Sequence, residues 1–310
     1  MINNDVWFAV VNPQSANGCT RKRWPKFLQR LEQEGYTVDF AYTLGPGDAT
    51  SITRRVLHEG YTRIISVGGD GTINEVVNGF FIDGCLINPD AELALFSHGT
   101  GGDFVRSLSI SRGIEGFIEI LKKGRKRTID VGEVQFLDDH GQPRNRYFLN
   151  VADIGLGGET VNRVNRQSKL LGGKISFLIG TMVSIFRYRN KTMRCKIDDK
   201  YCIEGRLNSI MVANGRYIGG GMMIAPNAEI DDGLFDVISL GDFSAWMLLR
   251  NIPKIYKGEH LKIPGVSEQR GGSVSITTAE KALLDIDGEQ PGQTPVKFTI
   301  HPKSLCIWDV

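Results

Sequence analysis

Short apolar segments alternate with amphipathic segments along the first 128 residues of the chain. The apolar segments have the β-branched character of buried strands and are Val6–Val11, Val38–Tyr42, Tyr61–Val67 and Leu93–Phe96. Between and after them, apolar residues recur at helical spacing, as they do from Ile73 to Phe80. Strands that alternate with helices predict an α/β domain with a parallel sheet.

The pattern changes after the basic run Arg125–Arg127. From there the chain consists mainly of short β-like runs separated by turn residues, namely Val131–Leu137, Tyr147–Ala152, Thr192–Ile197, Tyr201–Glu204, Asn208–Ala213, Leu234–Ser239, Ser273–Thr277 and Leu283–Ile286. One apolar helix, roughly Ser168–Phe186, is expected to interrupt them. We therefore predict an α/β domain over residues 1–128 and a mainly antiparallel β-sandwich or open-barrel domain over residues 129–296. Two last strands, Val296–Ile300 and Leu305–Trp308, fit either domain, so residues 297–310 are candidates for completing the first.

Composition narrows the class of protein. Hydrophobic content of 41% and charged content of 23% are typical of a soluble globular protein. A net charge of +2 gives no strong bulk attraction for nucleic acid, so no nucleic-acid partner is expected. The five cysteines are scattered without a Cys-x-x-Cys pair, which favours a reducing, cytoplasmic location. The longest uncharged apolar run, Ile175–Phe186, is well short of the ~20 residues that span a bilayer.

The segment Gly68–Glu75 is predicted to contain a glycine turn and a helix start. Its three glycines allow backbone conformations and close approaches that a Cβ would prevent. Thr72 and Glu75 have the spacing of a capping box. The first amides of such a helix favour an anion, and Asp70 among them suggests Mg²⁺ or proton transfer rather than anion binding alone. A tight turn without a ligand is the alternative, which three glycines around one acid make the weaker interpretation.

A second glycine loop, Gly99–Asp103, follows the last predicted strand of the first domain and also ends in an acid. On a neighbouring strand of the same sheet, it would form the second wall of a nucleotide site. His98 opens this loop and is the one histidine considered for the site. The chain contains no Gly-x-x-x-x-Gly-Lys-[Ser/Thr] sequence, so a P-loop NTPase is not expected.

Two acidic turns in the second domain have both a structural and a functional interpretation. Ala225–Asp236 contains Asp-Asp-Gly, a common hairpin signal whose carboxylates also suit Mg²⁺ or Ca²⁺. Asp285–Glu289 ends a strand with acids that point to both faces. Glu289 becomes a functional candidate only if it faces the nucleotide loops.

The chain contains two basic clusters, Lys122–Arg127 and Arg187–Lys191. Most such runs are merely solvated. Beside the apolar helix they would suit an anionic membrane surface, at about 1 kcal/mol per basic residue.

The run Gly68–Gly79 resembles the signature of the diacylglycerol kinase catalytic superfamily, which includes sphingosine and ceramide kinases. Gly-Gly-Asp-Gly alone is shared with NAD kinases and phosphofructokinases, whereas the longer run is more specific. The resemblance extends over nearly the whole chain, at Asn12-Pro13, Gly99–Asp103, Asp130, Asn150–Gly157, Asp231–Leu234 and Asp287–Glu289. It is closest to the soluble bacterial lipid kinases and implies a first domain of NAD kinase or diacylglycerol kinase type.

The resemblance also implies site residues. Asp70 and its glycines would hold the ATP phosphates and the catalytic Mg²⁺, and Glu289 matches the acid proposed as the base for the lipid hydroxyl. Whether Asp70 or Glu289 takes the proton stays open. The implied nucleotide-binding residues are Asn12, Thr43, Ser66, Gly68, Gly69, Gly71, Thr72, Asn74, Gly99, Thr100 and Asp103.

A structural metal is implied at the Asp-Asp-Gly turn, as Mg²⁺ or alternatively Ca²⁺. Its ligands would be Asp232 and the backbone oxygens of Glu229 and Leu234, with Asp130 as a partner in the acidic network. One departure from the family pattern is Gly102, which stands where asparagine is common, so one side-chain contact is missing there.

The function implied is that of an ATP- and Mg²⁺-dependent lipid kinase, which transfers the γ-phosphoryl group to a hydroxyl of diacylglycerol or a related lipid. Such an enzyme would belong to phospholipid biosynthesis and be cytoplasmic, with transient contact to a membrane surface and a homodimer as a plausible assembly. Two alternatives remain: a kinase of NAD or another polar metabolite, and a non-catalytic regulator that binds nucleotide or lipid.

Overall fold

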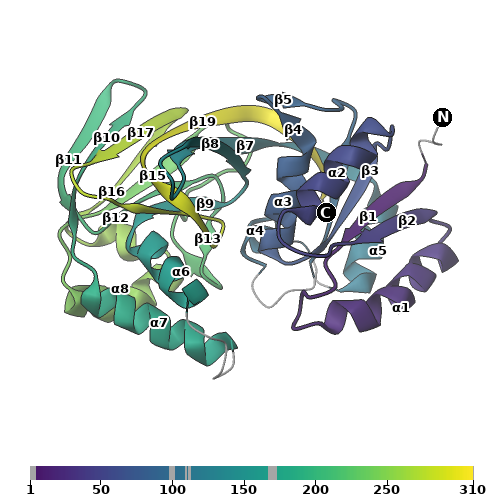
Figure 1. The fold of residues 1–310 in the computed structure, drawn as a ribbon, viewed down its shortest axis with the longest axis horizontal. Coiled ribbons are helices and arrows are strands. Elements are labelled where there is room, and N and C mark those ends of the chain that lie inside the picture. Colours follow the sequence, from purple (N-terminus) through teal and green to yellow (C-terminus); the bar gives the residue numbers. More distant parts are fainter. Residues whose placement is uncertain (1–4, 98–101, 109, 111–112, 167–172, 310) are drawn as a thin grey trace. The chain divides into compact units, whose positions relative to one another are not determined.

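The computed structural model describes residues 5–97, 102–108, 110, 113–166 and 173–309 and divides the chain into two compact units (Figure 1). Unit 1 comprises Met1–Val131 and Pro302–Val310, and unit 2 comprises Gly132–His301. Two long strands, β7 (Arg125–Leu137) and β19 (Glu289–Asp309), pass from one unit into the other. The chain therefore returns to unit 1 after completing unit 2.

Unit 1 is built on a parallel sheet, as predicted. Its strand order is β19-β6-β3-β1-β2, and every neighbouring pair is parallel. The strands that precede the return of the chain are β1 (Trp7–Val11), β2 (Val38–Tyr42), β3 (Arg63–Gly68) and β6 (Glu92–Ser97). Trp7 of β1 and Trp308 of β19 pack edge to face with ring centroids 5.2 Å apart, so the last strand shares the core of this unit.

Helices connect these strands in the alternating order that the sequence predicts. They are α1 (Cys19–Gln33), α2 (Asp48–His58), α3 (Asp70–Phe80), α4 (Asp103–Ser107) and α5 (Ile114–Lys123), and a hairpin of β4 (Phe81–Ile82) and β5 (Cys85–Leu86) follows α3. The apolar stripe of α3 is buried, with Ile73 and Phe80 at most 2% exposed. A Cβ on Gly79 would lie 2.5 Å from Thr53 and 2.8 Å from the Thr50 carbonyl, so this glycine lets α3 pack closely on α2.

The capping box predicted for α3 is wrong. The helix begins at Asp70, and Gly69 precedes it without a side-chain cap. Glu75 instead accepts the backbone N–H groups of Gly47 (2.9 Å) and Ala49 (3.1 Å) at the start of α2. A carboxylate from α3 therefore satisfies free amides of a different helix.

Unit 2 is a mainly antiparallel β structure, also as predicted. A path of strands runs β16-β15-β12-β9-β18-β19, while β10 pairs with β11 and β17, and β7 pairs with β8. The bounds are β8 (Pro143–Phe148), β9 (Val151–Gly155), β10 (Lys191–Ile197), β11 (Tyr201–Leu207), β12 (Ser209–Ala213), β15 (Phe235–Leu240), β16 (Val266–Gly271), β17 (Ser273–Thr278) and β18 (Leu283–Ile286), with a small hairpin of β13 (Tyr217–Ile218) and β14 (Met222–Met223).

Two strand predictions need correction. The run 147–152 is not one strand, because β8 ends at Phe148 and β9 begins at Val151. The runs 296–300 and 305–308 are not two strands but parts of β19.

The central strands of unit 2 are buried on both faces. Val212 of β12 and Val237 of β15 lie in one apolar core with residues of β10, β17, β18 and β19. Their neighbours Met211 and Ile238 point to the opposite face and pack in a second core with Leu248 of α8 (Ala245–Tyr256). Because both faces are covered, β9, β12 and β15 are buried along their whole lengths.

Three α-helices accompany the strands of unit 2 in the described part of the chain, where the sequence predicted one. They are α6 (Leu156–Arg166), α7 (Gly173–Arg187) and α8, followed by the short 3₁₀-helix His260–Lys262. The predicted helix 168–186 corresponds to α7, and its first residues, 168–172, lie outside the described residues. No described helix has the length and apolar character needed to cross a membrane.

Candidate functional site

The carboxyl ends of parallel strands in unit 1 bring the glycine turn and other predicted residues together. Val11 of β1 is in register with Val67 of β3, and Gly68 is in register with Ser97 of β6. The segments after these strands therefore start at one edge of the sheet. Such an edge is where open α/β sheets bind ligands.

Asp70 connects the first glycine turn to the second glycine loop. Its carboxylate accepts the backbone N–H groups of Gly102 (2.9 Å), Asp103 (3.2 Å) and Phe104 (3.4 Å). These amides begin α4, and Gly102 adopts a left-handed conformation with φ of 64°, which its lack of a Cβ permits. Asp70 thus fixes the start of α4, at Gly102–Phe104, relative to the first glycine turn.

Asn12 and Thr72 form a second contact at this edge. The side-chain amide of Asn12 donates to the Thr72 hydroxyl (3.0 Å), and the Asn12 backbone N–H donates to the Val67 carbonyl (2.9 Å). A Cβ on Gly68 would lie 2.3 Å from the Thr72 hydroxyl oxygen, so only glycine fits beneath this side chain. The close approach explains the first glycine of the turn.

The other predicted nucleotide residues of unit 1 differ in accessibility. Gly69 and Gly71 are partly exposed beside Asp70, and Thr43 follows β2, where its N–H donates to the Val11 carbonyl (2.9 Å). Ser66 and Asn74 are buried within β3 and α3, at 0% and 2% exposure. Gly99 and Thr100, together with His98, lie outside the described residues.

The two remaining acids of unit 1 are buried. Asp103 begins α4, directly after the amide of Gly102 that Asp70 binds. Asp130 is fully buried in β7 and accepts the backbone N–H of Lys303 (2.7 Å). That bond joins the two chain segments that complete unit 1, which gives Asp130 a structural role.

In unit 2, the turn Asp287-Gly288-Glu289 is held by the carboxylates of Asp285, which is buried, and of Asp287, which is partly exposed. Asp287 has a positive φ of 49° and accepts the N–H of Val151 (3.0 Å) and of Leu149 (3.4 Å). Asp285 accepts the N–H of Gly288 (2.9 Å). These bonds fix the backbone from which Glu289 projects.

Glu289 forms an ion pair with Arg146 of β8, at 2.6 Å between carboxylate and guanidinium. The Glu289 side chain is 43% exposed, so it is reachable from solvent. Arg146 was not predicted as a site residue. Its signal is the β7–β8 hairpin, which the sequence pattern did not reveal in full.

Asp153 and Asp285 are a pair of buried acids that the sequence analysis did not recognise. They are register partners on β9 and β18. Burial raises the pKa of Asp153 to about 7, although bonds from Ser209 and the Gly157 N–H oppose the shift. Burial and the nearby Asp153 raise the pKa of Asp285 well above its ordinary value. The protonated form is therefore favoured in this pair.

At the Asp-Asp-Gly turn proposed for a structural metal, an arginine side chain from β16 already pairs with the carboxylate. Asp232 forms an ion pair with Arg270 and accepts the N–H of Leu234 (3.0 Å). Arg270 also lies 3.4 Å from Asp236, whose pKa burial raises to about 6. No group of three or more acidic, histidine or cysteine side chains in the described residues is arranged for a metal ion. As it stands, this turn does not fit Mg²⁺ or Ca²⁺, because a guanidinium balances its charge.

The basic run 122–127 forms no free basic surface. Lys122 pairs with Glu34, Lys123 with Glu119, Lys126 with Glu92 and Arg127 with Asp309. Acids of the same unit therefore neutralise most of this run, and its interpretation as a membrane-binding segment is not supported.

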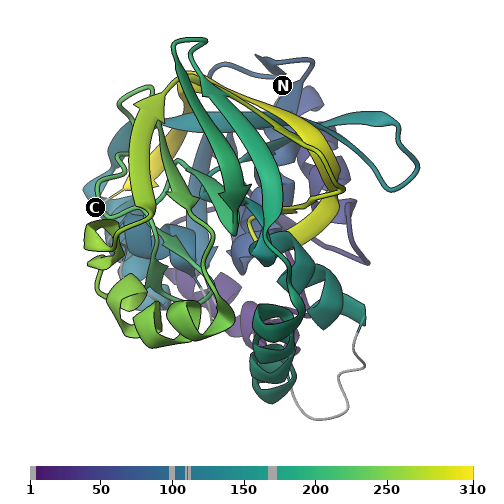
Figure 2. The same ribbon diagram turned by 90° about the vertical axis from the view of Figure 1, so that its left-hand side faces the viewer.

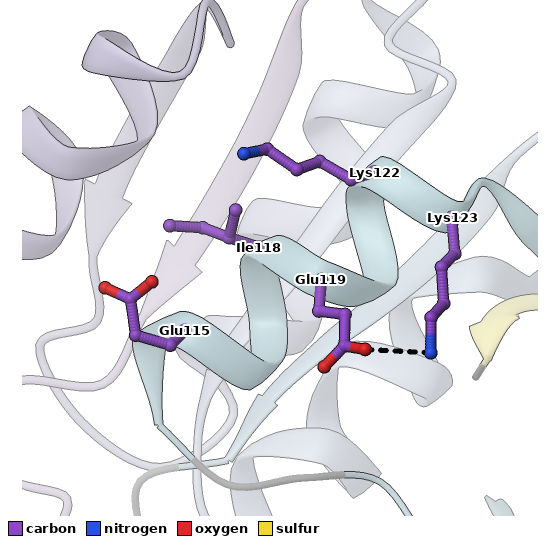
Figure 3. Close-up of a pocket in the computed structure, with 5 residues that line it drawn as sticks. All are labelled: Glu115, Ile118, Glu119, Lys122 and Lys123. Atoms are coloured by element: carbon purple, nitrogen blue, oxygen red, sulfur yellow. Dashed lines mark ion pairs between the residues drawn. The ribbon is translucent and has the colours of Figure 1, made fainter.

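A surface hollow of about 330 Å³ lies on α5 (Figure 3). It is lined by Glu115, Ile118, Glu119, Lys122 and Lys123, and the last of these pairs with Glu119 at 2.9 Å. None of the predicted site residues contributes to it. We assign it no role in binding.

Comparisons with known proteins cover both units. Residues 6–134 match the family of the diacylglycerol kinase catalytic domain, and residues 151–309 match the YegS C-terminal NAD kinase beta sandwich-like domain. A diacylglycerol kinase of Bacillus subtilis (strain 168) is 29% identical over 290 residues, which are 93% of this chain and 91% of that protein.

Solved structures share the fold. One from Bacillus anthracis str. Sterne superposes with a TM-score of 0.79 at 24% identity and covers 100% of this chain and 97% of its own. An NAD kinase from Archaeoglobus fulgidus, solved in complex with ATP, superposes with a TM-score of 0.52 at 14% identity and covers 98% of this chain and 93% of its own. At these identities the likeness concerns the fold.

Proposed function

Since residues 151–309 place the chain in the family of the YegS C-terminal NAD kinase beta sandwich-like domain, and residues 6–134 match the diacylglycerol kinase catalytic domain, we propose that it is a lipid kinase. It would transfer the γ-phosphoryl group of ATP to a hydroxyl of diacylglycerol or a related lipid. The observation that carries the proposal is the Asp70 carboxylate, which lies in the first glycine turn and binds the amides of Gly102 and Asp103 at the carboxyl-end edge of the parallel sheet. Two connected glycine segments suit the phosphates of a nucleotide, which need close backbone approach.

In this proposal unit 1 binds the nucleotide. Asn12, Thr72 and the glycines beside Asp70 contact the phosphates, and the hydrogen bonds of Asn12 to Thr72 and of Gly102 to Asp70 position these groups before binding. The Asp70 carboxylate accepts hydrogen bonds from three backbone N–H groups and keeps lone pairs for Mg²⁺. When bound, Mg²⁺ would neutralise phosphate charge. The chain's own contribution is the positioning of the reacting groups.

Unit 2 supplies Glu289 as the candidate base. Its carboxylate is exposed and its backbone is fixed by Asp285 and Asp287, which are the properties of a positioned proton acceptor. In this role Glu289 keeps its ion pair with Arg146 through one carboxylate oxygen, and the other oxygen takes the hydroxyl proton as the phosphoryl group is transferred. Asp70 remains the alternative acceptor of that proton.

The two alternatives differ from this proposal in their product. A kinase of NAD or another polar metabolite would use the same glycine turn, and the likeness to an NAD kinase fold keeps this alternative open. A non-catalytic regulator would bind nucleotide or lipid without transferring phosphate.

The test supplies γ-labelled ATP and Mg²⁺ together with either a total lipid extract or NAD. A lipid kinase puts label into the organic phase, and mass spectrometry then identifies the phosphorylated lipid. Label only in NAD would replace the lipid proposal with the polar-metabolite alternative. ATP binding without transfer to any acceptor would favour the regulator.

A further inference from the structure

The C-terminal end of α7 and one face of α8 form an exposed aromatic and basic surface on unit 2. Phe186 and Trp246 are 50% and 73% exposed, and their rings pack edge to face with centroids 5.6 Å apart. The two helices lie side by side beside the strands (Figure 2). We call this the α7–α8 surface and define it by Phe186, Arg187, Arg189, Trp246, Arg250, Lys254 and Lys257.

Helix α8 separates its two faces sharply. Trp246, Arg250 and Lys254 are exposed and recur at every fourth residue, so they share one face. Leu248 and Ile255 pack into the second core of unit 2 on the other side. The helix contains no acid, and Lys257 adds a further exposed cation directly after it.

The cationic side chains of the α7–α8 surface form no ion pairs with the described residues of the protein. In the described parts of the chain, no carboxylate forms an ion pair with Arg187, Arg189, Arg250, Lys254 or Lys257. This distinguishes them from the run 122–127, where acids of the same unit neutralise most of the charge. Unpaired cations around exposed aromatic rings suit an external partner that is negatively charged and has an apolar layer.

A hollow at the end of α7 is also lined mainly by positively charged side chains. It measures about 250 Å³ and is lined by Arg163, Arg187, Arg189 and Lys191, with Glu159 as its one acid. Positive charge therefore continues from the exposed helix faces into a concave site large enough for a phosphate group. Phosphate is the charged group of anionic phospholipids.

We propose that the α7–α8 surface docks the protein on an anionic lipid bilayer. Trp246 and Phe186 enter the boundary between head groups and acyl chains, where aromatic side chains on the apolar face of a helix are favoured. The surrounding cations are attracted by the negative surface potential of the leaflet. A second copy of the chain is a poor occupant, because a two-fold contact through this face would bring like charges together.

This inference rests on the proposed lipid kinase function, since a kinase that draws its acceptor from a bilayer must first reach it. Docking is nevertheless measured without ATP and without turnover. Loss of lipid phosphorylation with intact vesicle binding would count against the kinase function alone, and loss of vesicle binding alone would count against the docking surface.

The fluorescence of Trp246 reports docking directly. The other three tryptophans, Trp7, Trp24 and Trp308, are at most 8% exposed, so Trp246 is the one that responds to its surroundings. Vesicles of phosphatidylcholine and phosphatidylglycerol should shift the emission to shorter wavelength, and brominated phosphatidylglycerol should quench it. Trp246→Phe should remove both signals while binding persists in sedimentation.

Charge variants test the cationic part. Arg250→Gln with Lys254→Gln should weaken binding to phosphatidylglycerol vesicles about thirtyfold, because each basic residue near the membrane contributes about fivefold. The matched control is Lys196→Gln with Lys297→Gln, which removes the same charge from two exposed, unpaired positions on the sheet of unit 2. The control pair should bind like the unchanged protein.

Three results would overturn the proposal. The first is equal vesicle binding by the α8 pair and the control pair. The second is a Trp246 emission that vesicles leave unchanged. The third is protection of Trp246 without lipid, either by dimerisation in light scattering or by a single-stranded oligonucleotide.

Discussion

The carboxylate of Asp70 accepts the backbone N–H of Gly102 at 2.9 Å, across the two glycine segments of unit 1. The same carboxylate binds the amides of Asp103 and Phe104. The acid that the sequence analysis identified as a phosphate or metal residue therefore also holds the start of α4. Substitutions of Asp70 must separate these two roles.

Asp70→Ala should reduce kcat/KM by more than a hundredfold and lower the free energy of unfolding by about 1–3 kcal/mol, because three amides lose their acceptor. Asp70→Asn keeps one acceptor oxygen and should cost less stability, but it should be equally inactive. Steady-state kinetics and urea unfolding of both variants provide the measurement. Near-normal turnover in Asp70→Asn would mean that Asp70 only positions the loop.

Arg146→Ala should lower kcat about tenfold or more, because Glu289 loses the ion pair that orients it. The free energy of unfolding should change by less than about 1 kcal/mol, since the pair is partly exposed. Glu289→Gln should lower kcat by about 10²–10⁴, the range of general-base catalysis. Arg144→Ala is the control on the same strand, because Arg144 pairs with Asp138 and, among the described residues, forms no ion pair with Glu289. Equal kcat in Arg146→Ala and Arg144→Ala would exclude the orienting role.

Stability should fall as pH rises toward neutrality, owing to Asp153 and Asp285. Both carboxyl groups have a raised pKa in the folded protein, about 7 for Asp153, so the folded state binds more protons than the unfolded state above about pH 4. The stabilisation is complete below the ordinary pKa of aspartate and is lost as pH rises through the folded pKa. Each group contributes a slope of at most about 1.4 kcal/mol per pH unit.

Asp153→Asn should remove part of this dependence, so the loss of stability between about pH 5 and pH 7 should be smaller than in the unchanged protein. Asp199→Asn is the matched control, because Asp199 is exposed in the same unit. Urea unfolding at several pH values measures the slopes. Identical slopes for Asp153→Asn and the unchanged protein would refute the buried, protonated pair.

Glu75→Ala should destabilise unit 1 by about 1–2 kcal/mol, because two amides at the start of α2 lose their cap. Glu59→Ala removes an exposed i,i+4 partner of Arg55 and should cost no more than about 0.5 kcal/mol. Thermal unfolding of the two variants gives the comparison. Equal losses would show that Glu75 does not cap α2.

The sequence pattern predicts the parallel sheet of unit 1 because buried strands are continuous apolar runs, as in Ile64–Val67. The sequence pattern does not predict features that depend on tertiary contacts. Glu75 fits a local capping box, yet its long side chain reaches a different helix. Helix α8 contains Pro253 and carries cations on its exposed face, so its sequence gives a weak helix signal. Its apolar face is buried only because strands distant in the chain form the core on which it packs.

In the candidate site, too, residues with a local sequence signal were predicted, and residues whose role depends on strand register were not. Glycine turns and acids such as Asp70 and Glu289 stand out in the sequence because few local structures need them. Arg146 does not, since its contact with Glu289 depends on the register of strands far apart in the chain. Likewise, the pairing of Asp153 with Asp285 follows from the β9–β18 register, which no local pattern encodes.

The most direct measurement of the central claim is the formation of phosphatidate from diacylglycerol in phosphatidylglycerol-containing vesicles, with ATP and Mg²⁺, followed by mass spectrometry. The unchanged protein should form phosphatidate in proportion to time and enzyme, and both Asp70→Ala and Glu289→Gln should reduce it by at least about a hundredfold. No phosphorylated lipid from the unchanged protein, or equal amounts from the two variants and the unchanged protein, would contradict the assignment as a lipid kinase.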